Sequence, residues 1–201
     1  MARIETVERL REIIADYGPR GAAKIRDHVC EQGRAFIEGS PLVLLGTIGA
    51  GGIEISPKGD HAGFVEQVNA RELLIPERPG NHLCLSLQNI LDDPRVGLMF
   101  LRPATDEVLR VSGRATLHDD AELCERLRAG GKPAVLAIRV VVERAAFHCA
   151  RSLRRARLWD PASWDAPTRI SFGRIYAEAL GQAELEETFD RLSAESDAKL
   201  Y

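Results

Sequence analysis

The sequence predicts a mainly β protein: a small closed or split barrel of about six antiparallel strands, flanked by helices at both ends of the chain. Three observations support this fold class. Near each end, apolar residues recur at the spacing of an amphipathic helix. In the middle, short runs rich in Val, Ile and Leu have the length of strands. Gly, Pro and Asn residues separate these runs as turn formers do.

Two helices are expected before the first strand. Val7, Leu10 and Ile13 share the helical spacing, and the pattern resumes over 25–37 after a Gly-Pro-Arg-Gly break. We expect both helices to pack on the sheet. After the last strand, the segment 169–200 has the pattern of two further amphipathic helices with acidic flanks.

The central region begins with two predicted hairpins. Residues 41–48 form a strongly apolar run, the turn 49–52 is rich in glycine, and residues 53–56 alternate apolar with polar side chains. This pattern indicates two antiparallel strands joined by a tight turn. A second hairpin is expected from the runs 64–68 and 72–75.

A short helix is expected after the second hairpin. Asn81 is a good N-cap, the apolar pattern runs to Leu91, and Pro94 ends the helix. The remaining elements are two strands, a helix and a long final strand rich in Val, Ile and Phe, over residues 95–101, 107–117, 121–129 and 134–149.

Composition and charge narrow the classes of function. The chain has 201 residues, 45% of them hydrophobic and 28% charged, as in a single globular domain. Its 27 Lys and Arg residues face 30 Asp and Glu residues, and the resulting net charge of −3 does not favour binding to nucleic acid or to an acidic membrane. The apolar runs are also shorter than the roughly 20 residues that span a bilayer.

The cysteines and the first residues indicate a cytoplasmic protein. The four cysteines are widely spaced and form no Cys-x-x-Cys pair, which argues against a disulfide framework and against a metal site. The chain opens with the pattern of an amphipathic helix rather than that of a signal peptide. We therefore expect reduced thiols and no bound metal.

The first candidate binding residues lie in a Ser-Pro-Lys-Gly-Asp sequence. Ser56, Lys58 and Asp60 would lie where a strand leaves the sheet, and Gly59 would let the backbone approach a ligand closely. These residue types are also ordinary turn formers, so the same sequence can be a turn with a solvated lysine.

A second group of candidates surrounds the start of the predicted short helix. A phosphate placed there would meet free N–H groups, the positive end of the helix dipole and the guanidinium group of Arg78, after the close turn at Gly80. A helix that Asn81 merely caps explains that residue equally well. Ser86 and Asn89, on the first and second turns, can be ligand contacts or surface residues. The residues themselves therefore indicate an anion pocket.

Arginines form two further candidate groups. Arg110 and Arg114 are four residues apart in a predicted strand, so both side chains lie on one face, which lines a ligand cleft or faces solvent. Arg155 belongs to a basic cluster over 151–157 that precedes Trp159. This cluster can be a solvated helix face, or it can dock on a partner subunit or on a ligand phosphate.

These segments resemble the pyridoxamine 5'-phosphate oxidase-like group of FMN-binding split-barrel proteins. The resemblance runs from about Phe36 to Pro161, and its most specific signals are the strings DPRVGLMF and RVSGRA. The Ser-Pro-Lys-Gly-Asp and Arg-Pro-Gly-Asn sequences are similar to two turns of one branch of this group. The substrate motif near the C-terminus of true pyridoxamine-phosphate oxidases is absent, and RLWDPASWD is only loosely similar to it.

The resemblance implies a six-stranded split barrel over residues 41–160, with helices over 1–40 packed on it and helices over 161–201 after it. It also implies a homodimer that holds two FMN molecules at the subunit interface. Carried over by motif, Ser56, Lys58, Gly59 and Asp60 would line the flavin, Arg78, Gly80, Asn81 and Ser86 would bind the phosphate end, and Arg155 and Trp159 would reach the cofactor from the other subunit.

Two kinds of function follow from the resemblance. The first is an FMN-dependent oxidoreductase that passes electrons between a reduced nicotinamide or small organic substrate and an acceptor. The second is a module that stores, senses or delivers FMN without turnover. Relatives that bind haem or a deazaflavin supply a third alternative. We favour the oxidoreductase, with an unknown substrate.

Overall fold

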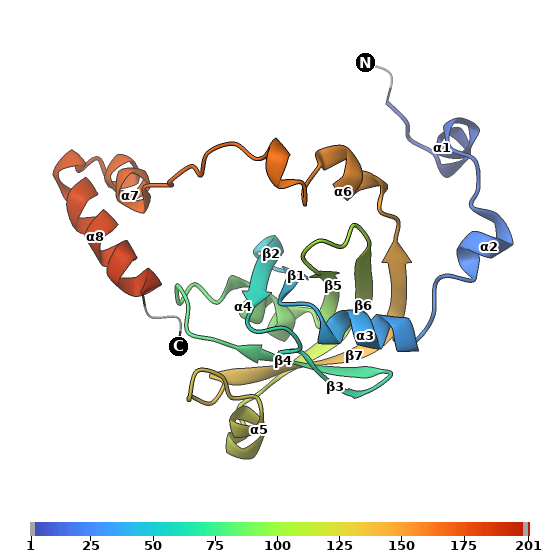
Figure 1. Cartoon of the computed structure of the whole chain (residues 1–201), viewed down its shortest axis with the longest axis horizontal. Helices are drawn as coiled ribbons and strands as arrows, with labels where there is room; N and C mark the ends of the chain where they lie inside the picture. The colour runs from blue at the N-terminus through green and yellow to red at the C-terminus, as the bar shows by residue number, and fades with distance from the viewer. Residues whose placement is uncertain (1–2, 199–200) are drawn as a thin grey trace.

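The protein is built on one antiparallel sheet (Figure 1). The computed structural model describes residues 3–198 and 201. Within these residues the sheet has seven strands in the order β2-β1-β5-β6-β7-β4-β3. In chain order they are β1 (Leu42–Gly49), β2 (Gly52–Gly59), β3 (Glu66–Asn69), β4 (Glu72–Glu77), β5 (Arg95–Leu101), β6 (Val108–His118) and β7 (Leu136–His148).

The predicted fold class is confirmed: the protein is mainly β, with the antiparallel split-barrel arrangement and flanking helices. The strand count differs from the prediction by one. The described residues contain seven strands, and the hairpin expected from 64–68 and 72–75 is present as β4 and the short edge strand β3. β3 has four residues and pairs only with β4.

Alternation along the strands places the core inside the curved sheet. In β6, Leu109, Val111 and Ala115 are buried, whereas Arg110 and Arg114 on the other face are exposed. This is the period of two that a half-buried strand requires. The largest completely buried side chains come from five strands and one helix, and include Ile37, Leu45, Leu73, Ile75, Phe100, Leu109 and Ile138.

A β-bulge interrupts the pairing of the two longest strands. The register between β6 and β7 shifts between Ser112 and Gly113, which pair with Arg144 and Val142. A Cβ atom at Gly113 would lie 2.0 Å from the carbonyl oxygen of Val141. Only glycine allows the strands to approach this closely, so the bulge explains why a strand interior carries that residue.

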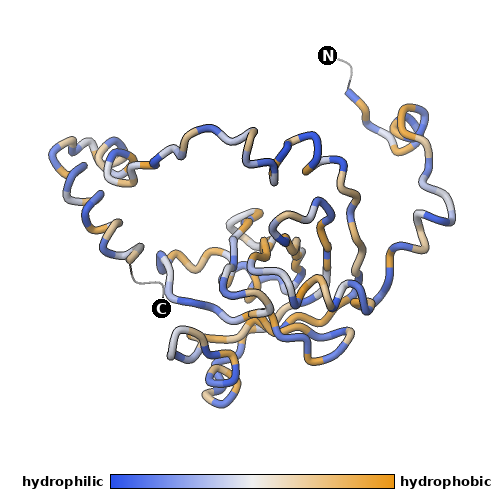
Figure 2. Tube along the Cα trace, viewed as in Figure 1, coloured by the Kyte–Doolittle hydropathy of each residue, from blue (hydrophilic) through white to orange (hydrophobic). Residues whose placement is uncertain are grey.

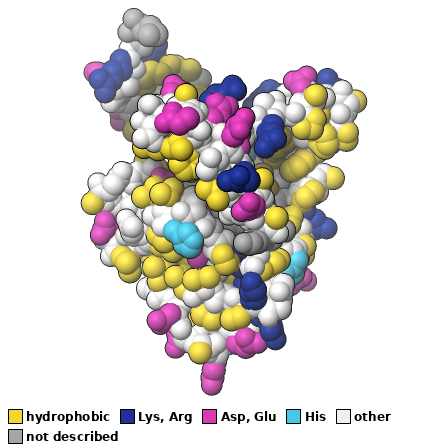
Figure 3. Space-filling view, turned by 90° about the vertical axis from the view of Figure 1, so that its left-hand side faces the viewer, with side chains coloured by type: hydrophobic (Ala, Val, Ile, Leu, Met, Phe, Trp, Pro, Cys, Tyr) yellow, Lys and Arg dark blue, Asp and Glu magenta, His cyan; other side chains and the backbone are white. Residues whose placement is uncertain are grey.

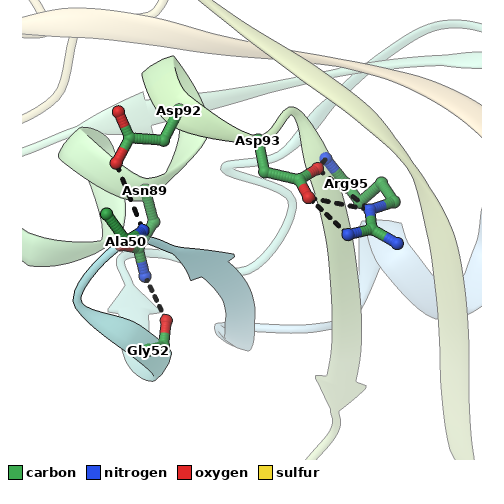
Figure 4. Close-up of polar contacts among 6 residues, drawn as sticks. All are labelled: Ala50, Gly52, Asn89, Asp92, Asp93 and Arg95. Carbon is green, nitrogen blue, oxygen red and sulfur yellow. Dashed lines mark hydrogen bonds and ion pairs between the residues drawn. The ribbon is translucent and has the colours of Figure 1, made fainter.

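The hairpin of β1 and β2 is held by the helix α4 (Leu85–Asp92) (Figure 4). Asn89 Nδ2 donates to the carbonyl oxygen of Gly52 at 3.1 Å and to Thr47 Oγ1 at 3.3 Å. The amide of Ala50 donates to Asp92 Oδ2 at 3.3 Å. Because β1 and β2 close on a two-residue turn, these bonds fix the hairpin to the helix that follows in the chain.

The remaining helices precede β1 or follow β7 in the sequence, except α5, which connects β6 to β7. They are α1 (Val7–Ile13), α2 (Gly18–Ala22), α3 (Glu31–Glu38), α5 (Ala121–Arg126), α6 (Arg151–Ala156), α7 (Phe172–Leu180) and α8 (Glu186–Asp197), with short 3-10 helices at Pro161–Ser163 and Ala183–Leu185. Among the described residues, no helix combines the length and apolar character needed to cross a membrane.

The N-terminal region differs from the two helices expected there. The second expected helix, over 25–37, is helical only from Glu31, as α3, and the Gly-Pro-Arg-Gly segment expected to be a break forms the short helix α2. α3 packs on the sheet through Phe36 and Ile37, whereas α1 and α2 contain no buried residue. Figure 1 shows α1 and α2 away from the sheet, and Figure 2 shows hydrophobic residues along the strands but also on α1.

The two predicted C-terminal helices are confirmed as a helical hairpin, α7 and α8. The rings of Tyr176 and Phe189 are 5.3 Å apart. Asp190 on α8 accepts from the amide of Gly173 at 2.8 Å and from the hydroxyl of Ser171. An extended segment after α6 carries this hairpin across the molecule to the side of α4 and β4 (Figure 1). On the face seen in Figure 3, basic and acidic side chains are interspersed among hydrophobic ones.

Candidate functional site

A cleft of about 380 Å³ lies between the inner face of β2, the end of β4 and the start of α4. Its walls come from three segments that are separate in the sequence. The lining residues are Glu54, Ser56, Lys58, Glu77, Arg78, Pro79, Gly80, Asn81, His82, Leu83, Cys84, Leu85, Ser86, Leu87, Val135 and Leu136. The structure therefore brings two separate groups of predicted residues to one cleft.

β2 supplies one wall because its side chains alternate. Ser56, Lys58 and then Asp60 are partly buried on one side, whereas Ile55 and Gly59 are exposed on the other. The expectation that Ser56 and Lys58 follow the strand is wrong, since β2 continues to Gly59. A proline is tolerated in this strand because β2 is at the edge of the sheet and needs no N–H on its open side.

Lys58 forms an ion pair inside the cleft. Its Nζ donates to Glu77 Oε1 at 2.9 Å and lies 2.7 Å from Glu77 Oε2. Oε2 itself is buried and lacks a partner with hydrogen-bond geometry within the described residues. Glu77 was not among the predicted site residues, because nothing in the local sequence shows that the end of β4 faces β2.

Arg78 forms a second and more buried ion pair. Its Nε donates to Asp60 Oδ2 at 2.7 Å, and the Asp60 side chain is only 1% exposed. Burial by itself would raise the pKa of Asp60, but hydrogen bonds from Tyr201, the His61 amide and Arg78 outweigh burial and lower it to about 2. The carboxylate is therefore charged at neutral pH, and the pair is a true ion pair.

The Nη1 group of Arg78 is both buried and unpaired: within the described residues it has no hydrogen-bond partner. An unpaired buried donor costs free energy, so such a group usually has a ligand, a water or a role in binding. Because Arg78 lines the cleft, this donor is the strongest local indication of an acceptor bound there.

The start of α4 lies three residues later than predicted. Asn81 was expected to cap the helix, but the N-cap is Cys84, which has a left-handed φ of 55° and makes no capping hydrogen bond through its side chain. Asn81 Oδ1 instead accepts from the amide of Leu83 at 3.1 Å, which is a local turn. The first amides of α4 therefore have no side-chain cap, and Ser86 beside them is buried in the lining.

Asn89 lies outside the cleft, although it shares α4 with Ser86. Its side chain is 6% exposed and binds the β1–β2 hairpin, as described above. A Cβ atom at Gly49 would lie 2.4 Å from Asn89 Oδ1, so glycine is required for this close approach. The contact partners of Asn89 indicate a structural role.

Arg110 lies in a different concavity, a groove of about 420 Å³ on the outer face of the sheet. The groove is mainly apolar, and its floor includes Gly46, Gly97 and Met99 from neighbouring strands. Arg110 and Arg114 share a face, as predicted, but Arg114 does not line this groove. Neither arginine lines the cleft that contains Lys58 and Arg78.

Arg155 and Trp159 belong to α6 and the turn after it. Trp159 Nε1 donates to the carbonyl oxygen of Thr105 at 2.9 Å, which fixes this segment to the β5–β6 loop. Arg155 is exposed. Neither residue lines the Lys58 and Arg78 cleft of the same chain.

Of the two glycines predicted to bind, Gly80 lines the cleft and Gly59 faces away from it.

Comparison with known proteins identifies the family. The family model described as pyridoxamine 5'-phosphate oxidase matches residues 30–149. No curated protein is similar enough to count as a match. Among solved structures, HupZ of Group A Streptococcus is 17% identical, with a TM-score of 0.50 over 60% of this chain and 99% of that chain.

Two other solved structures show weaker similarity. A candidate pyridoxamine 5'-phosphate oxidase from Lactobacillus delbrueckii is 21% identical, with a TM-score of 0.47 over 60% of this chain and 94% of that chain. General Stress Protein 26 from Bacillus anthracis is 13% identical, with a TM-score of 0.45 over 57% of this chain and 88% of that chain. The family model covers more than half of the sequence, from the start of α3 to the end of β7, and the chain therefore belongs to the pyridoxamine 5'-phosphate oxidase family.

Proposed function

We propose that this protein binds FMN and acts as an FMN-dependent oxidoreductase. The observation that carries the proposal is the unpartnered, buried Nη1 donor of Arg78 in the lining of the cleft. A phosphate oxygen is the acceptor that a guanidinium donor binds best, and membership of the family supports FMN as its source. The FMN-binding unit would be residues 41–160.

The phosphate end would be held by donors from the cleft walls. The uncapped amides at the start of α4, the hydroxyl of Ser86 and Arg78 Nη1 all belong to one lining. Helix N-termini bind phosphate because free N–H groups and the helix dipole act together. Ser56 and Lys58 on β2 would contact the more distal part of the same ligand.

Ion pairs within the cleft determine how it would recognise an anion. Lys58 is paired with Glu77, and Arg78 is paired with Asp60. The two cations are therefore largely neutralised by the protein itself. Attraction by net charge would be weak, so recognition of an anion would depend on directed hydrogen bonds rather than on an electropositive field.

A second subunit would complete the site. Arg155 and Trp159 do not line the cleft of their own chain, and the apolar groove on the outer face of the sheet offers a surface for a second copy. We propose a homodimer in which these two residues reach the cofactor of the partner. Bound FMN would supply hydride and electron transfer, while the residues of this chain bind and orient it.

The first experiment tests FMN binding with Arg78→Lys. Lysine keeps the charge opposite Asp60 but lacks the second nitrogen, so the fold should be retained. Loss of one charge-assisted hydrogen bond of about 1.5 to 3 kcal/mol predicts roughly tenfold to a hundredfold weaker FMN binding. Fluorescence titration of FMN measures this, and Arg71→Lys, in a surface ion pair with Asp27, is the matched control. Unchanged affinity in Arg78→Lys would refute the phosphate assignment.

Two further experiments test the rest of the proposal. If the protein is an enzyme rather than an FMN store, NADH or NADPH should reduce bound flavin, and reoxidation by oxygen or a quinone should turn over faster than free FMN. To test whether the site is shared, an Arg78→Ala chain is co-expressed with a Trp159→Ala chain. In a mixed dimer, one site would combine the intact Arg78 of one chain with the intact Trp159 of the other, and the second site would carry both changes. FMN binding at half stoichiometry would support sharing, and no recovery would contradict it.

A further inference from the structure

A row of mostly small residues crosses the outer face of the sheet. Directly paired residues of antiparallel strands have their side chains on the same face. The pairs Ile55–Gly46, Gly46–Gly97, Gly97–Ser112 and Ser112–Arg144 therefore form one continuous row across β2, β1, β5, β6 and β7. All five residues line the groove of about 420 Å³ described above. The floor of the groove at β1 and β5 is thus bare backbone, and a large side chain stands at each end of the row.

The two glycines of this row are not required by the chain itself. Neither has a φ in the left-handed region. Within the described residues, a Cβ atom at Gly97 would meet nothing within 4 Å, and one at Gly46 would meet only the carbonyl oxygen of Gly97, at an ordinary contact distance of 3.5 Å. Glycine weakens a strand interior, and it often marks the close approach of a ligand or of another backbone. The reason for these two glycines therefore lies outside the chain.

Apolar side chains form most of the wall of the groove. Leu44 and Met99 pair with each other in the next row of the sheet, and both line the groove. Ile25 and Ile55 also line it and are 45% and 64% exposed. A planar ring can lie flat on the bare strands and contact the thioether of Met99, which is a favourable contact for an aromatic group. The shape of the groove therefore fits an aromatic ligand.

Two arginines give the groove a positive charge. Arg110 pairs with Met99 and Arg144 ends the first row, and both line the groove. Arg139, further along β7, has its own partner in Glu72. Within the described residues, neither Arg110 nor Arg144 forms an ion pair, and no acidic residue lines the groove. A second copy related by a two-fold axis through this face would bring the same arginines to it rather than carboxylates. The charges therefore favour a small anion.

We propose that this groove is a second ligand site, for a planar aromatic carboxylate whose ring lies on Gly46 and Gly97 and whose carboxylate binds the two arginines. Guanidinium and carboxylate groups match in geometry as well as in charge. No residue of the groove lines the cleft proposed for FMN, so this site does not depend on the proposed function. A second copy that covers this face of the sheet would enclose the ligand.

Isothermal titration with 2-naphthoate tests the role of the charges, and 2-naphthylmethanol is the neutral ligand with the same ring. Wild type should bind naphthoate saturably and at least tenfold more tightly than the alcohol, because only the carboxylate forms charge-assisted hydrogen bonds with arginine. Arg144→Gln should weaken naphthoate binding about tenfold and change binding of the alcohol less than twofold. Arg114→Gln, on the same face of β6 but outside the groove, is the matched control and should change neither.

Three results of this titration would overturn the proposal. The first is the absence of saturable naphthoate binding to wild type. The second is an equal loss for naphthoate and for the alcohol in Arg144→Gln. The third is binding of decanoate, an aliphatic carboxylate, as tightly as naphthoate, because a planar ring would then have no advantage on the glycine floor.

Gly97→Val tests the floor itself. Valine favours strands and its Cβ would lie in open space, so the urea midpoint should not fall. Naphthoate binding should be at least tenfold weaker, because the side chain takes the place of the ring, whereas FMN binding should be unchanged. Gly97→Ala, which adds only the Cβ atom, should act in the same direction with a smaller effect.

The same variants distinguish the other occupants of the groove. Unchanged naphthoate binding in Gly97→Val overturns the proposal. Loss of a dimer in Gly97→Val, measured by sedimentation equilibrium, in a protein that binds no naphthoate would assign the groove to a second copy and overturn it. Weaker FMN binding with unchanged naphthoate binding would assign the groove to the flavin and also overturn it.

Discussion

Replacement of Asp60 by asparagine tests the central ion pair of the cleft without any ligand. Asparagine has the shape of aspartate and can still accept from Tyr201 and from the His61 amide, but it has no charge to offer Arg78. In the native protein the pKa of Asp60 is lowered from 3.8 to about 2, a difference of roughly 1.8 units. At 1.36 kcal/mol per unit, the ionised carboxylate contributes about 2 kcal/mol to the free energy of unfolding.

The sign of the pH dependence follows from the direction of the shift. Because the pKa is lower in the folded state, the contribution is complete above pH 5 and is lost as the pH falls through 4 towards 2. The difference in unfolding free energy between wild type and Asp60→Asn should therefore shrink by about 2 kcal/mol between pH 5 and pH 2. The contributions of the other carboxylates to the unfolding free energy are the same in both proteins and cancel in the difference.

Urea unfolding followed by far-UV circular dichroism, in half-unit steps of pH, measures this difference. Asp27→Asn is the matched control, because the pKa of Asp27 is also lowered to about 2, by hydrogen bonds with His28 and Arg71, but its side chain is 64% exposed. The pH-dependent difference in unfolding free energy between wild type and Asp27→Asn should be smaller than that for Asp60→Asn, and added salt should reduce it further. A pH-independent difference for Asp60→Asn would refute the assignment of a charged, buried pair.

Three further predictions concern the described contacts. Asn89→Ala should lower the unfolding free energy by about 1 to 3 kcal/mol, because the hairpin carbonyl and hydroxyl lose their buried donor; urea unfolding checks this, with Asn81→Ala as the exposed control. Gly113→Ala should cost about 3 kcal/mol or more, since its Cβ would collide with the facing strand, and a near-neutral change in melting temperature would contradict the bulge. The pKa of Tyr201 is raised above 10 by its hydrogen bond to Asp60 and by burial, so ultraviolet titration should show it ionising at lower pH in Asp60→Asn than in wild type; an unchanged titration would argue against that bond.

Most of the sheet could be predicted because its strands carry their own signal. The apolar runs that became β1, β5 and β7 each have the period and turn residues of a strand. The end of β2 was missed, since Pro57 and Gly59 favour a turn locally and only the edge position of β2 permits them in a strand. Local propensity was overridden here by the position of the strand in the sheet.

The site was only partly predictable because its key contacts are long-range. The sequence indicated Lys58, Arg78 and Asp60 as ligand contacts, but it gave no sign that two of them form an ion pair with each other or that Glu77 neutralises the third. Asn81 has the composition of an N-cap, yet the chain makes a further turn before α4 begins. Tyr201 could not be found by any local pattern, because its partners lie far away in the sequence.

The proline in β2 has a consequence for how copies of this protein can meet. An exposed edge strand ordinarily offers a row of N–H and C=O groups on which a strand from another molecule can grow. β2 ends the sheet, and Pro57, near the end of this strand, has no N–H group to offer. Addition of a further strand along β2 is thereby discouraged at this position.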